Sequence, residues 1–214
     1  MKKIILLLIT VLTLMSCSEN LYNGSGDLTS EMRNVSSFTK VKSEGIFNVN
    51  IVQGETQSVE VIADDNIIHK VNTKVVNNEL RLSLKNGNYQ DITLNINITV
   101  KQINGIKNTG SANMYIDNVA EQNDFRIDNM GSGDIIINGI ASKLFVENEG
   151  SGSVLGFGFF VEECNVEIIG SGNLEINCSN KLNIEIEGSG NVYYKGNPQL
   201  TTDITGSGQV ISRN

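Results

Sequence analysis

From Gly110 onward, apolar and polar residues recur in fixed columns along the chain. The repeat is marked by a glycine-serine pair, and its first glycines are Gly110, Gly131, Gly150, Gly170, Gly188 and Gly206, which lie 21, 19, 20, 18 and 18 residues apart. The fourth residue after each glycine is always apolar: Met114, Ile135, Val154, Leu174, Val192 and Val210. The third is always polar: Asn113, Asp134, Ser153, Asn173, Asn191 and Gln209. This period of two predicts short β-strands on both sides of a Gly-Ser-Gly corner.

A repeat of this length is typical of a solenoid, in which each repeat forms one coil. We therefore predict an all-β fold, a right-handed parallel β-helix (β-solenoid) with coils of about 18–21 residues. The right hand is expected because crossovers between parallel strands are almost always right-handed. Coils stack about 4.8 Å apart, and a corner glycine leaves room for the backbone of the next coil. The first corner departs from the motif, because Ala112 replaces its second glycine.

One inward-facing column changes from polar to apolar partway along the repeats. Two residues before the corner glycine the chain carries Asn108, Asn129 and Asn148, and then Ile168, Ile186 and Ile204. A buried amide is tolerated when it is hydrogen-bonded, and stacked amides can pair along a coil axis. We therefore expect an asparagine ladder in the first three corners.

The first 17 residues have the pattern of a bacterial lipoprotein signal. Lys2 and Lys3 precede an apolar run from Ile4 to Leu14, which is too short to span a bilayer. The run ends in Leu14-Met15-Ser16-Cys17, which resembles a lipobox. We predict that residues 1–16 are removed and that Cys17 carries the lipid. The protein is then exported and lipid-anchored, in the outer membrane of a Gram-negative bacterium.

The remaining chain divides into a linker and one domain. Residues 17–34 are polar and are predicted to be the lipidated N-terminus and a tether. Residues 35–214 are predicted to form a single β-solenoid domain, with opening coils and a cap over 35–105 and the Gly-Ser-Gly coils over 106–214. Within the opening part, Asp64-Asp65-Asn66 is expected to cap a short helix through Val71.

Composition excludes several classes of protein. The formal charge of −8 becomes −10 when Lys2 and Lys3 leave with the signal. Such an acidic chain is a poor partner for nucleic acid, and its membrane association depends on the lipid. His69 is the only histidine, and no nucleophile motif or phosphate loop occurs. Cys164 and Cys178 are interpreted as buried thiols, although export permits a disulfide.

Two outward columns are candidate sites. Stacked carboxylates occupy the third position before the corner glycine in five coils: Asp128, Glu147, Glu167, Glu185 and Asp203. They form either a solvated face that discourages aggregation or a site for Ca²⁺ or another hard cation. An apolar column occupies the fifth position after the glycine, interrupted only by Glu175: Tyr115, Ile136, Leu155, Tyr193 and Ile211. It is either a binding or oligomer surface or a surface covered by the N-terminal coils or a loop.

The aromatic run Phe157-Gly158-Phe159-Phe160 lies where two coils join, and the longer spacing suggests a bulge. Its aromatic residues either fill the core or bind sugar. For an enzyme on this scaffold, two carboxylates must converge in a groove. Asp128 and Asp134 are the candidate pair, although Asp134 also fits the polar column beside the corner.

The signal, the lipobox and the repeated corners together resemble the auto-transporter adhesin family with the head GIN domain. The resemblance covers about Val35 to Val210. It implies a fold similar to the pectin-lyase-like β-helix and a role in adhesion, and it carries over no catalytic residue. We expect a non-enzymatic adhesion or binding module of the cell envelope, with a glycan or protein surface as ligand and a homo-oligomer as one option. The alternatives are a carbohydrate-active lyase or hydrolase, or a structural assembly module.

Overall fold

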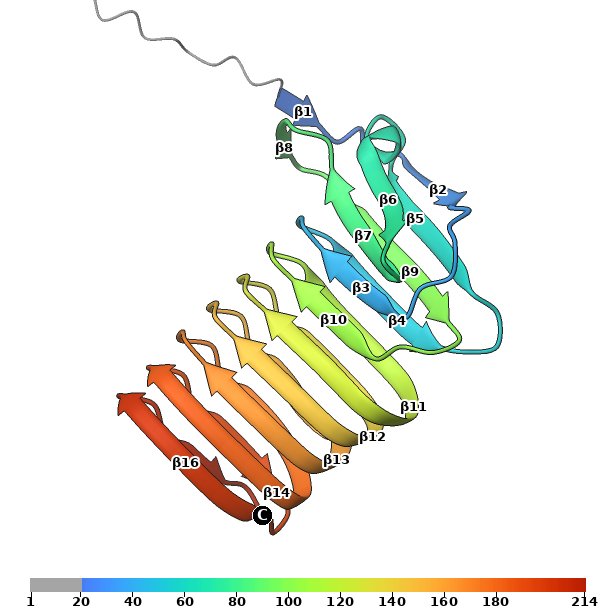
Figure 1. Ribbon diagram of the computed structural model, residues 1–214. Coiled ribbons are helices and arrows are strands. Elements are labelled where there is room, and N and C mark those ends of the chain that lie inside the picture. The colour runs from blue at the N-terminus through green and yellow to red at the C-terminus, as the bar shows by residue number, and fades with distance from the viewer. Residues whose placement is uncertain (1–20) are drawn as a thin grey trace, which may run out of the picture.

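The computed structural model describes residues 21–214, which form a stack of β-coils with a cap at one end (Figure 1). The strands are β1 (Leu21–Asn23), β2 (Leu28–Met32), β3 (Lys40–Ser43), β4 (Asn48–Gln53), β5 (Ser58–Asp64), β6 (Val71–Val76), β7 (Glu79–Leu84), β8 (Asn88–Gln90), β9 (Leu94–Val100), β10 (Gly105–Asn108), β11 (Asn113–Asn129), β12 (Ile135–Asn148), β13 (Val154–Ile168), β14 (Leu174–Gly188), β15 (Val192–Lys195), β16 (Gln199–Gly206) and β17 (Val210–Ser212). One 3-10 turn, η1 (Ile68–Lys70), interrupts them. Within this part of the chain, no helix is long and apolar enough to cross a membrane.

The coils stack in two columns of parallel strands, one before and one after each corner. Column 1, before the corners, runs in the order β7, β3, β10, β11, β12, β13, β14 and β16. Column 2, after the corners, runs β9, β4, β11, β12, β13, β14, β15 and β17. The long strands β11 to β14 belong to both columns, because each continues around the far end of its coil. The predicted β-solenoid is confirmed; its right hand and its likeness to the pectin-lyase-like fold stay predictions.

The glycine corners lie directly on top of one another. The Ser132 N–H donates to the Gly110 carbonyl at 3.1 Å, and the Ser207 N–H donates to the Gly188 carbonyl at 3.0 Å. A Cβ atom added at Gly131 would lie 1.8 Å from the Gly110 carbonyl oxygen. Glycine is therefore required there because two backbones approach closely.

The order of the coils in space differs from their order in the sequence. The coil of β3 and β4 lies between the coil of β7 and β9 and the coil that begins with β10. From the coil of β3 and β4, which is second in the stack, the chain continues through β5 and β6 at the end of the stack. It then forms the terminal coil with β7 and β9. Finally it skips the coil of β3 and β4 and continues with β10 on the other side of that coil. Two antiparallel pairs, β5 with β9 and β6 with β7, close this end. The cap thus determines where the terminal coil lies.

The predicted tether is wrong for the residues from Leu21 onward; residues 1–20, including Cys17, lie outside the described part. β1 pairs in parallel with β8, and β2 pairs antiparallel with β5. Every side chain of β2 is exposed, so backbone pairing holds this strand without burial. The buried Asp64 carboxylate also fixes the segment, because it accepts the Gly26 N–H at 2.8 Å and the Thr93 N–H at 2.7 Å. The hydrogen bond from Thr93 is the main cause that lowers the pKa of Asp64.

The predicted helix after Asp64 is reduced to the single turn η1, and its predicted side-chain cap is wrong. The residue at the N-cap is Ile67, and no side chain caps the turn. The polar residues before it bind the N-terminal segment instead: Asp65 accepts the Ser25 hydroxyl at 2.6 Å, and Asn66 donates to the Asn23 carbonyl at 2.8 Å.

The core lies between the two columns. The asparagine ladder is confirmed for its first pair, because the Asn108 amide donates to Asn129 Oδ1 at 3.1 Å. Each ladder asparagine also donates across its own corner to the carbonyl four residues later, as Asn148 does to Gly152 at 3.1 Å. Cys164 and Cys178 are free thiols, as expected, and burial raises the pKa of the Cys164 thiol.

Candidate functional site

The flat coils present two outward faces, one from each column. Because strand residues alternate between the core and the outside, one outward residue per coil aligns into a row along the stack. We call the outward residues of column 1 the charged face. We call Tyr115, Ile136, Leu155, Tyr193 and Ile211 on column 2 the apolar stripe.

The apolar stripe is uncovered and is interrupted at one coil. Each member lies in register with the next coil: Tyr115 pairs with Ile136, and Tyr193 pairs with Ile211. Glu175 occupies the stripe between Leu155 and Tyr193. Tyr115 is 42% exposed and the other four members are half-buried. The N-terminal coils therefore do not cover the stripe; they extend the column with Asn50 and Asn97.

A polar row runs beside the stripe, and hydrogen bonds join its members from coil to coil. The Asp134 N–H donates to Asn113 Oδ1 at 3.1 Å, and the Ser153 N–H donates to Asp134 Oδ1 at 2.8 Å. The same bond recurs from Asn191 to Asn173 at 3.0 Å. Each oxygen thus fixes the strand of the following coil. At the far end of the stripe the Arg213 guanidinium lies 4.8 Å from the centre of the Tyr193 ring.

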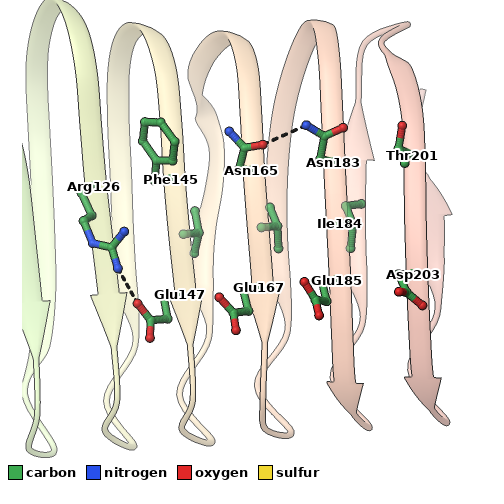
Figure 2. A pocket seen from close by; sticks show the side chains of 12 residues that line it. Arg126, Phe145, Glu147, Asn165, Glu167, Asn183, Ile184, Glu185, Thr201 and Asp203 are labelled. Carbon is green, nitrogen blue, oxygen red and sulfur yellow. Dashed lines mark hydrogen bonds and ion pairs between the residues drawn. The ribbon is translucent and has the colours of Figure 1, made fainter.

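The charged face carries an open groove of about 360 Å³ over its C-terminal coils (Figure 2). Glu147, Glu167, Glu185 and Asp203 follow one another along one side. Phe145, Asn165, Asn183 and Thr201 form the other row, in which the Asn183 amide donates to Asn165 Oδ1 at 2.8 Å. At the N-terminal end of the groove Arg126 forms ion pairs with Asp128, at 2.7 Å, and with Glu147.

The five predicted carboxylates are brought together in register, but their electrostatic surroundings differ. Asp128 is paired with Arg126 and lies 3.9 Å from the Lys107 amine. Burial nevertheless raises the pKa of Asp128. A hydrogen bond with Glu147, with a further contribution from its charge, raises the pKa of the neighbouring Glu149. The acidic rows therefore repel one another.

The structure extends this column beyond Lys107 with cations that sequence reasoning missed. Lys107 pairs in register with Lys42, Lys42 with Arg81, and Arg81 with Lys74 of the cap. Lys42, and not Arg81, lies beside Lys107 because the coil of β3 and β4 is inserted into the stack. The alternation of apolar and polar residues within each strand shows that these cations face outward, but it does not show which coils lie next to them.

The structure separates the candidate catalytic pair, Asp128 and Asp134. Over residues 21–214, no three histidine, cysteine or carboxylate side chains gather closely enough to hold a metal ion. Asp128 belongs to column 1, whereas Asp134 belongs to the polar row of column 2 and accepts a hydrogen bond from the Ser153 N–H. His69 is exposed on η1.

The aromatic run forms a bulge inside β13, where the register to β14 shifts between Gly156 and Phe160. Phe159 is buried and packs edge-on against Phe125, with 5.4 Å between the ring centres. Phe160 is 56% exposed at the far end of its coil. One aromatic residue therefore fills the core, and its neighbour is free at the surface.

A rigid stack of coils with two flat outward faces defines the class of β-solenoid binding scaffolds. The chain belongs to the family described as "Putative auto-transporter adhesin, head GIN domain", whose model matches residues 37–198. The family and the fold together support a binding or adhesion module.

Solved structures share this fold. A putative adhesin from Bacteroides fragilis is 21% identical with a TM-score of 0.75, and the match covers 90% of this chain and 100% of that one. A putative lipid binding protein from Parabacteroides distasonis is 19% identical with a TM-score of 0.57, covering 91% and 100%. A putative adhesin from Parabacteroides merdae is 22% identical with a TM-score of 0.54, covering 91% and 100%. No curated protein matches the sequence.

Proposed function

We propose that the protein is a non-enzymatic, lipid-anchored adhesion or binding module of the cell envelope, and that its contact surface is the apolar stripe. The observation that supports this is the register of the stripe: apolar residues from five of six successive coils align in one uncovered row, in which Glu175 takes the remaining place. Monomeric proteins seldom leave a large apolar patch in water unless it meets a partner.

The geometry of the stripe suits an extended ligand. From Tyr115 to Ile211 the stripe crosses five steps of about 4.8 Å, which is roughly 24 Å. Its members are mostly aliphatic, and polar rows flank them, which is the pattern of a protein interface with an apolar centre and a polar rim. A protein surface is therefore the favoured ligand, and an extended glycan that stacks on the tyrosines is the second option.

The anchor suits the orientation of the stack. Leu21, the first described residue, lies at the capped end (Figure 1). A lipid on Cys17, four positions earlier, holds this end near the membrane and directs the C-terminal coils outward. The location we propose is the outer membrane. Two acyl signals suffice for stable anchoring, so Cys17→Ser should move the protein from the membrane fraction to the soluble fraction and abolish labelling by a fatty acid. A protein that stays in the membrane fraction after this change contradicts the anchor.

Binding is tested with the mature chain carrying Cys17→Ser. It is screened against immobilised envelope and matrix proteins and against a glycan array, with and without Ca²⁺. Retention should fall at least tenfold in Tyr115→Ser/Tyr193→Ser, because the stripe loses its two aromatic members. The matched control is Phe160→Ser, which removes an exposed aromatic residue from outside the stripe. Equal retention by both variants would contradict the assignment of the stripe.

The enzymatic alternative has a separate test. The mature chain is incubated with acidic and neutral glycans, and new reducing or unsaturated ends are measured. We expect none. Turnover that Asp128→Ala abolishes would overturn the non-enzymatic proposal.

A further inference from the structure

The central row of the charged face is divided by sign along the axis of the stack. From the cap onward, its central row reads Lys74, Arg81, Lys42, Lys107, Asp128, Glu147, Glu167, Glu185 and Asp203, each in register with the next. Four cations therefore precede five carboxylates, and the sign changes once, between Lys107 and Asp128.

This segregation disfavours the isolated chain. Like charges directly opposite each other on neighbouring strands destabilise a sheet, and alternating signs would avoid that. Within residues 21–214, Arg126 forms ion pairs with Asp128 and Glu147. Beside the row, Glu44 pairs with Lys42 and Glu79 pairs with Arg81. No ion pair in this part of the chain reaches Glu167, Glu185 or Asp203. Lys74 and these three carboxylates are exposed.

We propose that two copies of the chain pair through their charged faces in antiparallel orientation, about a two-fold axis that runs along the strand of Asp128. The two-fold reverses the row, so every cation meets a carboxylate of the second copy. Lys107 then faces Glu147, Lys42 faces Glu167, Arg81 faces Glu185 and Lys74 faces Asp203, each pair occurring twice. At the axis the two Asp128 side chains keep their Arg126 partners. Such a surface is self-complementary, as a two-fold interface must be.

The shape of the face supports the same register. The row beside the charges carries Gly105 one coil before the axis and Phe145 one coil after it. Gly105 leaves a hollow of about 200 Å³ lined by Lys40, Lys107 and Arg126, among others. The two-fold places Phe145 of one copy over this hollow in the other. An aromatic residue that enters a pocket at the centre of a patch is a common anchor of protein interfaces.

The area of the face sets the expected affinity. Eight steps of about 4.8 Å, with strands of about 13 Å, give on the order of 500 Å² per copy. That is the low end for a specific interface. The dimer should therefore form in a concentration-dependent way and weaken as salt shortens the screening length from about 10 Å at 0.1 M to about 3 Å at 1 M.

The antiparallel orientation has a consequence for adhesion, which rests on the proposed anchor at Cys17. The two capped ends lie at opposite ends of the dimer, so the two anchors point in opposite directions. Chains on two facing membranes satisfy this geometry, and the pairing then joins the two surfaces. The apolar stripe stays free, because it belongs to column 2.

The test uses charge reversal and sedimentation equilibrium of the mature chain carrying Cys17→Ser. Lys42→Glu places two carboxylates face to face at both symmetric contacts, and Glu167→Lys places two cations there. Each variant alone should dimerise at least about tenfold more weakly. A mixture of the two should recover the wild-type affinity, because both contacts of the mixed dimer are then complementary. The double variant in one chain should recover it as well.

The controls separate this effect from general charge and from folding. Lys181→Glu and Glu162→Lys change the same charges on exposed residues outside the central row and the groove, and should leave dimerisation unchanged. Phe145→Ser should weaken the dimer without a change of charge. A wild-type chain that stays monomeric at low salt overturns the proposal, and so does a dimer in which the mixture shows no recovery.

Vesicles that carry the lipidated protein test the link between membranes. Vesicles with Lys42→Glu should aggregate with vesicles that carry Glu167→Lys, and neither kind should aggregate alone. Because ligand retention by the stripe is measured separately, failure of this pairing and failure of the proposed function give different results. Aggregation that does not depend on the charge combination overturns the facing-membrane arrangement.

Discussion

Replacing Gly150 with alanine tests whether the corners are packed too tightly for any side chain. A Cβ atom at Gly150 would lie 1.8 Å from the carbonyl oxygen of Gly131 and 2.8 Å from its carbonyl carbon. Both atoms belong to the backbone of the neighbouring coil, so no side-chain rotation relieves the contact. The corners must separate, which stretches the bonds from the Gly150 N–H to Asn129 and from the Gly152 N–H to Gly131, both 3.3 Å long.

The expected cost follows from these contacts. Overpacking costs about 1–3 kcal/mol, and each weakened hydrogen bond costs about 0.5–1.5 kcal/mol. We therefore expect the free energy of unfolding to fall by about 3 kcal/mol, which corresponds to a Tm lower by about 6–12 °C for a chain of this size.

The assay is thermal unfolding followed by far-UV circular dichroism, together with guanidinium titration. The matched control is Gly105→Ala, because a Cβ there would meet the Arg126 carbonyl at 3.4 Å, an ordinary contact. This control should stay within about 1 kcal/mol of the wild type, since alanine suits a strand at least as well as glycine. If both variants melt at the same temperature, close packing of the corners is not what requires glycine.

Two further predictions concern buried polar groups. The pKa of Asp64 is lowered from about 3.8, so the stability that its carboxylate contributes is present above that pH and is lost as the pH falls through the lower, folded-state pKa. The urea midpoint of the wild type should therefore fall in acid more than the urea midpoint of Asp64→Asn. Parallel pH profiles of the two proteins would contradict this. Asn129→Ile should cost about 1–3 kcal/mol, because Asn129 bonds both Asn108 and the Gly133 carbonyl. Asn148→Ile should lower the free energy of unfolding by less, because Asn148 Oδ1 has no hydrogen-bond partner within residues 21–214. Guanidinium unfolding that ranks the two variants in the opposite order would refute the ladder.

The register of the Gly-Ser-Gly coils could be predicted from the sequence because each coil makes the same set of contacts with the next. The pairing of Leu174 with Val192 follows directly from their equal distance to a corner glycine. Such columns need only the period of two along a strand and the repeat length between corners. The same reasoning located the apolar stripe.

The order of the first coils could not be read in this way. The stretches 40–53 and 79–100 show similar alternation, and neither carries a Gly-Ser-Gly corner. Their neighbours are determined by pairings distant in sequence, such as the bond from the Asn50 amide to Asn97 at 3.1 Å. The order of the cations in the central row depends on this order of coils, so the sequence could not show that Lys42, and not Arg81, lies beside Lys107.

The N-terminal strands were missed for a different reason. β2 buries none of its side chains, so its sequence shows no alternation of apolar and polar residues. Its position depends on backbone pairing to β5 and on the contact of Gly26 with Asp64. A polar edge strand of this kind has the composition of a linker.

A disulfide cross-link tests most directly that the coils stack in the order described, on which both faces depend. In the structure Lys42 and Lys107 are in-register neighbours, whereas Arg81 and Lys107 lie two coils apart, at about 9.6 Å. Disulfides need Cα atoms closer than about 7 Å. Under mild oxidation, Lys42→Cys/Lys107→Cys should therefore form an intramolecular disulfide detectable by peptide mass spectrometry, and Arg81→Cys/Lys107→Cys should stay reduced. The reverse result would show that the coils stack in sequence order and would contradict the account.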